Sequence, residues 1–164
     1  MKKFISYVLL IVAAVTLYGC DKVDNNALPG YTVRLNLGDY ARWSTYGVAG
    51  AGQYRVFNRE KQIPSNFPYD VNTYTGYGGL LLMMGIDMVP MAYDMACPIE
   101  ARPTTVISID DSNFEAVCPD CKSRFNVLTG DGGPISGMAL NHKKGLTKYR
   151  VYSSQYGGYI VTNY

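Results

Sequence analysis

The run from residue 31 to residue 37 reads Tyr31-Thr32-Val33-Arg34-Leu35-Asn36-Leu37. Its apolar side chains, Val33, Leu35 and Leu37, alternate with polar ones. A period of two predicts a half-buried β-strand, because successive side chains of an extended chain point to opposite faces. No later stretch has a sustained helical period, and Tyr, Val and Thr recur between closely spaced glycines and prolines. We therefore expect an all-β fold, an antiparallel β-sandwich.

Similar short segments recur along the chain. Further strands are expected near residues 54–58, 80–84, 89–93, 104–109, 114–117, 148–152 and 159–162. Turns are expected at Gly78-Gly79, at residues 110–113 and at Gly157-Gly158. The stretch from Gly47 to Gly52 lacks the Gly-x-Gly-x-x-Gly spacing of a phosphate-binding turn, so we interpret it as a loop.

The N-terminus has the pattern of a secretory signal. Two lysines precede an apolar run from Ile5 to Leu17, and Leu17-Tyr18-Gly19-Cys20 then fits a lipoprotein processing site. We expect residues 1–19 to be a lipoprotein signal peptide, and lipidated Cys20 to anchor the mature protein to a membrane of the cell envelope, on its periplasmic or surface side. An ordinary cleavable signal peptide followed by a chance cysteine is the alternative.

Processing changes the charge and the length. Removal of residues 1–19 takes away two lysines and no acidic residue, so the formal net charge falls from +2 to zero. A neutral body argues against nucleic acid as a partner, because phosphate binding requires clustered positive charge. Residues 20–29 are mostly polar and are expected to be a flexible tether, which leaves residues 30–164 as a single domain.

Two Cys-Pro turns lie about twenty residues apart. They read Cys97-Pro98-Ile99-Glu100 and Cys118-Pro119-Asp120-Cys121. Soft thiolates grouped on tight turns are typical of sites that hold iron–sulfur clusters or zinc. With Cys20 assigned to the lipid, Cys97, Cys118 and Cys121 are the candidate metal ligands.

These loops resemble those of the Rieske iron–sulfur domain. In that family a strand pair leads into a Cys-x-His loop, a hairpin follows, and a second loop carries Cys-x-x-His, Gly-Ser-x-Phe and a Gly-Pro-Ala turn that covers the cluster. Cys97 and Cys118 match the two cysteines, residues 122–125 resemble the Gly-Ser-x-Phe stretch, and residues 137–139, Gly-Met-Ala, resemble the covering turn. The resemblance, which spans residues 78–152, implies a Rieske-like fold, an iron–sulfur centre and electron transfer with a redox partner protein of the envelope.

The departures from the family pattern fall on the ligands. Ile99 stands where the family has its first histidine, and Cys121 stands where it has the second, so the usual iron with two histidine ligands cannot be built. A three-thiolate site for zinc or a cluster iron needs a fourth ligand, and the candidates are Glu100 and His142. The competing interpretations are a Glu100 carboxylate that is solvated or paired with Arg102, and a His142 side chain exposed in a turn.

Other interpretations of the sulfur atoms stay open. A disulfide from Cys97 to Cys118 or Cys121 would make a metal-free, disulfide-stapled structural or binding module, although it would leave one thiol over. A redox-active Cys118-x-x-Cys121 dithiol would need a helix N-terminus, which we do not expect here. Copper is a further alternative because the chain offers thioether donors at Met83, Met84, Met88, Met91, Met95 and Met138, but methionine is also a common core residue.

The sequence gives no sign of an enzyme. It contains one histidine, His142, and nothing around it resembles the neighbourhood of a nucleophile. Trp43 and the tyrosines are expected to fill the core rather than to form a binding platform. We expect a non-enzymatic protein.

Overall fold

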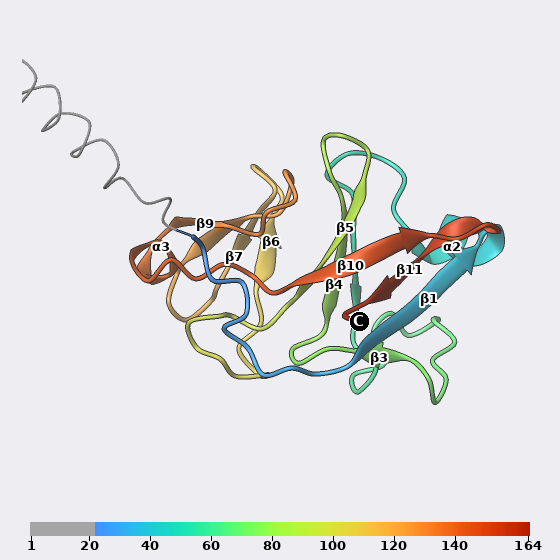
Figure 1. Ribbon diagram of the computed structural model, residues 1–164, viewed down its shortest axis with the longest axis horizontal. Helices are drawn as coiled ribbons and strands as arrows, with labels where there is room; N and C mark the ends of the chain where they lie inside the picture. The colour runs from blue at the N-terminus through green and yellow to red at the C-terminus, as the bar shows by residue number, and fades with distance from the viewer. Residues whose placement is uncertain (1–21) are drawn as a thin grey trace, which may run out of the picture.

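The computed structural model describes residues 22–164 and is an all-β fold of antiparallel sheets, as expected (Figure 1). The larger sheet, in its spatial order, contains β2 (Tyr54–Phe57), β4 (Leu80–Met84), β5 (Pro90–Asp94), β10 (Lys148–Ser153), β11 (Gly157–Thr162), β1 (Val33–Asp39) and β3 (Tyr74–Thr75). The smaller sheet contains β6 (Ser108–Asp110), β7 (Glu115–Val117), β8 (Arg124–Asn126) and β9 (Pro134–Ser136). Within the described range the helices are α2 (Tyr40–Tyr46) and α3 (Met138–Asn141).

Strands β4 and β5 form the centre of the molecule, because every residue in them is buried. Successive side chains of a strand point to opposite faces, so each strand contributes to two cores. Leu80 and Leu82 pack with side chains of β1 and β11, whereas Leu81 and Met83 pack with Ala116 and Phe125 of the smaller sheet and with other buried side chains around it. The apolar run of β4 therefore lacks the alternation seen in β1.

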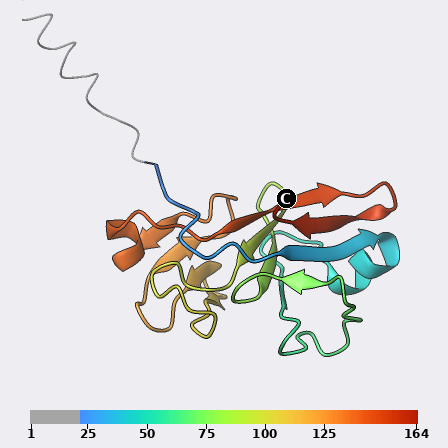
Figure 2. The ribbon, with the colours of Figure 1, turned by 60° about the horizontal axis from the view of Figure 1, so that its bottom comes forward.

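The larger sheet folds over on itself to make the first of these cores. Strand β10 pairs with β5 through only two residue pairs, Lys148 with Tyr93 and Tyr149 with Ala92, and then continues beside β11. Figure 1 shows β4 and β5 running across the direction of β1, β10 and β11. The smaller sheet lies at the opposite end of the molecule from α2, an arrangement also visible in Figure 2. The result is three layers with β4 and β5 in the middle.

Several local expectations were wrong. Helix α2 was not expected; it begins after Asp39, whose carboxylate accepts a hydrogen bond from the Arg42 N–H, and it is too short to show a sustained helical period. Strands β3, β8 and β9 and helix α3 were also not expected, because each is only two to four residues long. Gly157 and Gly158 begin β11 instead of forming the turn, and the chain reverses just before them.

The described chain begins inside the expected tether. The Asp24 N–H donates to the Lys143 carbonyl at 2.8 Å, and the Asp24 carbonyl accepts from the Gly145 N–H at 2.9 Å. This part of residues 20–29 therefore lies against the domain. The expected signal peptide, residues 1–19, and Cys20 lie outside the described residues. None of the described helices is long and apolar enough to cross a membrane.

Burial on both faces makes a testable prediction for neighbouring residues of β4. Leu81→Ala and Leu82→Ala should each lower the free energy of unfolding by about 2–5 kcal/mol, because each opens a cavity in a different core. In β1, only one of two neighbours should matter: Leu35→Ala should be costly, whereas Arg34→Ala should change stability by about 0.5 kcal/mol or less. Urea unfolding measures the free energy of unfolding of all four variants. A loss of less than about 1 kcal/mol for either β4 variant would contradict a two-faced strand.

Candidate metal centre

Strands of both sheets bring three cysteines together. Cys97 follows β5, whereas Cys118 directly follows β7 and Cys121 lies between β7 and β8. Their sulfur atoms all lie within 4.8 Å of one another, and those of Cys97 and Cys121 are 3.6 Å apart. Cys97 and Cys118 are fully buried, and Cys121 is partly exposed. Such a group can hold a metal ion.

The two cysteine loops, residues 97–101 and 118–122, form the same backbone turn. The Ala101 N–H donates to the Cys97 carbonyl at 2.8 Å, and the Lys122 N–H donates to the Cys118 carbonyl at 3.2 Å. Ala101 and Lys122 both have a positive φ, 48° and 57°. The N–H of each first cysteine donates at 3.0 Å to a carbonyl farther along the chain. The loops are therefore two copies of one turn, placed around one group of sulfur atoms.

Backbone donors in both loops point at sulfur. In each loop the N–H groups of the residues two and three positions after the first cysteine donate to the sulfur of that cysteine, Cys97 or Cys118. Hydrogen bonds of this kind favour the thiolate over the thiol. Because the thiolate is the form that binds metals, both turns are preorganised for a cation.

The three thiols differ in acidity because their surroundings differ. Burial raises the pKa of Cys97 to about 12 and raises the pKa of Cys118 above its ordinary value, in each case against the N–H donors of the loop. Burial also disfavours the Cys121 thiolate, but hydrogen bonds from Ser123 and from the neighbouring thiols outweigh it and lower the pKa of Cys121. Cys121 is thus the thiol that ionises most readily.

Ser123 connects the second loop to the turn that covers it. Its Oγ lies 3.2 Å from the Cys121 sulfur and accepts a hydrogen bond from the Ala139 N–H at 3.0 Å, which leaves the hydroxyl proton free to reach a thiolate. Gly137 has a φ of 79°, and a Cβ there would lie 2.9 Å from the Ser123 Cα. The turn at residues 137–139 therefore lies against the second loop, so closely that only glycine fits at position 137.

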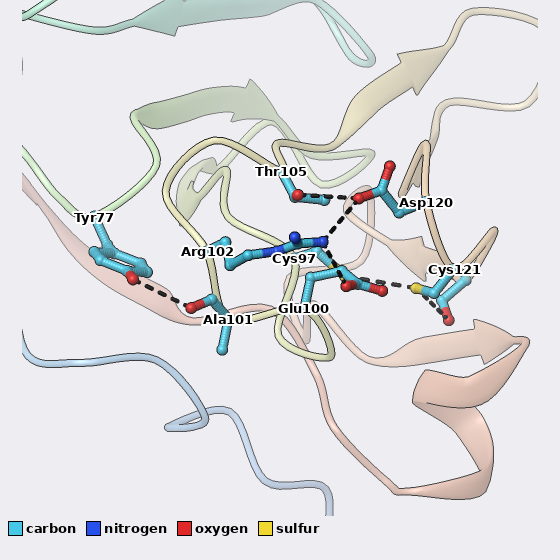
Figure 3. Close-up of polar contacts among 9 residues, drawn as sticks. Tyr77, Cys97, Glu100, Ala101, Arg102, Thr105, Asp120 and Cys121 are labelled. Carbon is cyan, nitrogen blue, oxygen red and sulfur yellow. Dashed lines mark hydrogen bonds and ion pairs between the residues drawn. The ribbon is translucent and has the colours of Figure 1, made fainter.

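A second set of contacts, which we call the Arg102 clasp, joins the two loops through Glu100, Arg102, Thr105 and Asp120 (Figure 3). Arg102 donates to Glu100 Oε2 at 2.9 Å and to Asp120 Oδ2 at 3.2 Å. The Thr105 hydroxyl donates to the same Asp120 oxygen at 3.1 Å. The clasp therefore connects the first loop to the second without using a sulfur atom.

The structure brings together three of the expected site residues and leaves two apart. Among the described residues the ligand group consists of Cys97, Cys118 and Cys121 and includes neither Glu100 nor His142. The Glu100 carboxylate is paired with Arg102, and His142 is exposed where α3 ends. The roles of Ser123 and of the Asp120 contact in the clasp were not expected, because each depends on contacts that close only in the folded chain.

The structure bears differently on the disulfide, the redox-active dithiol and the copper interpretations. Cys97, Cys118 and Cys121 are free, and the second loop forms a turn rather than the start of a helix. Four of the six methionines proposed as copper donors are buried in the cores, which accounts for them without copper: Met83, Met84, Met91 and Met95. Met88 and Met138 are exposed.

Comparison with known proteins adds no family assignment. No protein-family model matches the chain, and no curated protein matches it. The candidate site therefore depends on the geometry of Cys97, Cys118 and Cys121.

The differences among the thiols predict an order of alkylation. In reduced, metal-free protein at neutral pH, iodoacetamide should modify Cys121 well before Cys97 and Cys118, because Cys121 is both the most exposed and the most acidic of the three. Raising the pH toward the ordinary thiol pKa should narrow the difference in alkylation rate between Cys121 and an exposed model thiol, because the model thiol then ionises as well. Peptide mapping by mass spectrometry measures the order. Equal rates at all three cysteines would contradict it.

Proposed function

We propose that this chain is a lipid-anchored protein of the cell envelope whose Rieske-like β domain holds one metal ion, zinc, through Cys97, Cys118 and Cys121. The observation that carries the proposal is the convergence of three sulfur atoms within 4.8 Å on two equivalent turns. The N–H groups aimed at the sulfur atoms add support, because they stabilise the charge that a metal requires.

The sulfur spacing favours one ion over a two-iron cluster. A tetrahedral zinc with Zn–S bonds of about 2.3 Å sets its sulfur ligands about 3.8 Å apart, close to the 3.6 Å between Cys97 and Cys121. A [2Fe–2S] cluster divides four protein ligands between two irons, so ligands on different irons are separated by the width of the cluster. Three mutually close thiols, with the apolar Ile99 at the position of a histidine, fit that arrangement poorly. Zinc has no redox chemistry, so the ion would stabilise the loops rather than carry electrons.

The order of elements supports the Rieske-like part of the proposal. The β4–β5 pair leads into the first cysteine loop, the β6–β7 hairpin follows, and the second loop is packed against the turn at residues 137–139. The same order supports a second candidate function, an iron–sulfur electron carrier with a redox partner in the envelope. A third candidate is the metal-free module, in which a disulfide joins Cys97 to another cysteine of the group.

The envelope assignment rests on the N-terminal sequence. The apolar run and Gly19-Cys20 support lipidation at Cys20. Because Asp24 already contacts the domain, only a few residues would separate the lipid from the fold. The chain contains one histidine, His142, which is not part of the cysteine group among the described residues, so we propose a binding protein and not an enzyme.

Single substitutions test the metal proposal. Cys97→Ser, Cys118→Ser and Cys121→Ser should each remove most of the bound zinc, measured by elemental analysis of purified protein, because a hydroxyl is a poor replacement for a thiolate. Cys20→Ser is the control: it should leave zinc content unchanged and move the protein from the membrane fraction to the soluble fraction.

A different pattern would reject zinc. Iron accompanied by acid-labile sulfide would favour the electron carrier. If the wild type carries no metal, and only two of the three substitutions lower stability, by about 2–5 kcal/mol, in a way that dithiothreitol reproduces in the wild type, the disulfide module is correct.

A further inference from the structure

The equivalence of the two cysteine loops pairs Glu100 with Cys121. Each lies three residues after the first cysteine of its loop, and each donates its N–H to the sulfur of that cysteine. Each is followed by a residue with positive φ whose N–H closes the turn. Because the backbones match, the side chains of Glu100 and Cys121 leave their turns in equivalent directions relative to the neighbouring sulfur. The Cys121 side chain enters the ligand group.

The Glu100 side chain is long enough to follow the same direction. Its carboxylate is held outside the thiol group by Arg102, toward which Figure 3 shows it turned. The side chain is only 24% exposed, compared with 57% for Arg102, so it lies at the edge of the site rather than in open solvent. To reach an ion among the thiols, the Glu100 carboxylate would have to leave the Arg102 guanidinium by rotation about its side-chain torsions.

We infer that Glu100 is the fourth ligand of the metal centre and that Arg102 holds its carboxylate until the ion binds, an inference that rests on the proposed zinc site. Three thiolates and one carboxylate complete a tetrahedral shell, and oxygen from a carboxylate is an accepted zinc ligand. When Glu100 turns to the ion, Arg102 keeps its contact with Asp120, so the clasp between the loops persists. The guanidinium then stays beside a site with excess negative charge, which it stabilises.

His142 does not compete for this role. Its ring is exposed where α3 ends, and its backbone N–H donates to the Met138 carbonyl at 3.0 Å, which fixes it in the helix end. It has no equivalent position in either cysteine loop. The loop geometry therefore distinguishes between two residues that the sequence leaves equal.

The clasp supplies a matched pair of variants. Glu100→Gln and Asp120→Asn each remove one carboxylate partner of Arg102, but only the first removes a metal ligand. In zinc titrations of full-length protein against a chromophoric chelator, Glu100→Gln should weaken affinity by at least about tenfold. Asp120→Asn should weaken it by no more than about fivefold, the range expected for an exposed ion pair. Circular dichroism would confirm that both variants fold.

Cobalt substitution gives a second measurement. Glu100→Cys should retain tetrahedral Co(II) absorption and gain thiolate charge-transfer intensity over the wild type, because a fourth thiolate joins the ion. If the wild type binds zinc and both carboxylate variants bind equally well, the assignment of Glu100 is overturned while the metal centre stands. If the wild type takes up neither metal, both proposals are overturned.

Discussion

Strands β4 and β5 are buried on both faces, and this burial holds the two parts of the molecule together. It creates one core toward β1 and β11 and another toward the smaller sheet, so the two parts of the molecule cannot separate without exposing β4. The end of β5 is fixed by Asp94, a buried carboxylate that accepts hydrogen bonds from the N–H groups of Tyr77, Gly78 and Ala96 and from the Tyr149 hydroxyl. Cys97 follows three residues later, so its position is set by the core.

At the rigidly held cysteine site, burial and hydrogen bonding have opposite effects on the thiols. Cys97 and Cys118 are buried, and burial raises their pKa although N–H donors point at both sulfur atoms. The N–H donors favour the thiolate, whereas burial disfavours its negative charge. A bound cation would compensate that charge. Zinc binding would release protons, so affinity should fall as pH decreases. A single ion bound by both turns, as proposed, would remove this conflict in both.

Particular residues show how far the sequence could predict the structure. The alternation at Val33, Leu35 and Leu37 was sufficient to predict the strand β1. The two Cys-Pro turns, together with their resemblance to the Rieske loops, were sufficient to predict that the three thiols lie together. Helix α2 was missed because seven residues cannot show a sustained period. The equivalence of the two loops depends on the backbone angles of Ala101 and Lys122, and the Arg102–Asp120 contact spans eighteen residues; neither leaves a local pattern in the sequence.

X-ray absorption at the zinc edge of protein purified from membranes, without added metal, distinguishes one bound zinc ion from an iron–sulfur cluster and from a metal-free site. A single ion in the cysteine group predicts zinc with three sulfur neighbours at about 2.3 Å and one oxygen neighbour at about 2.0–2.2 Å. Iron with a second iron in its neighbouring shell would contradict the account and favour a cluster. So would metal-free protein in which two of Cys97, Cys118 and Cys121 are joined by a disulfide.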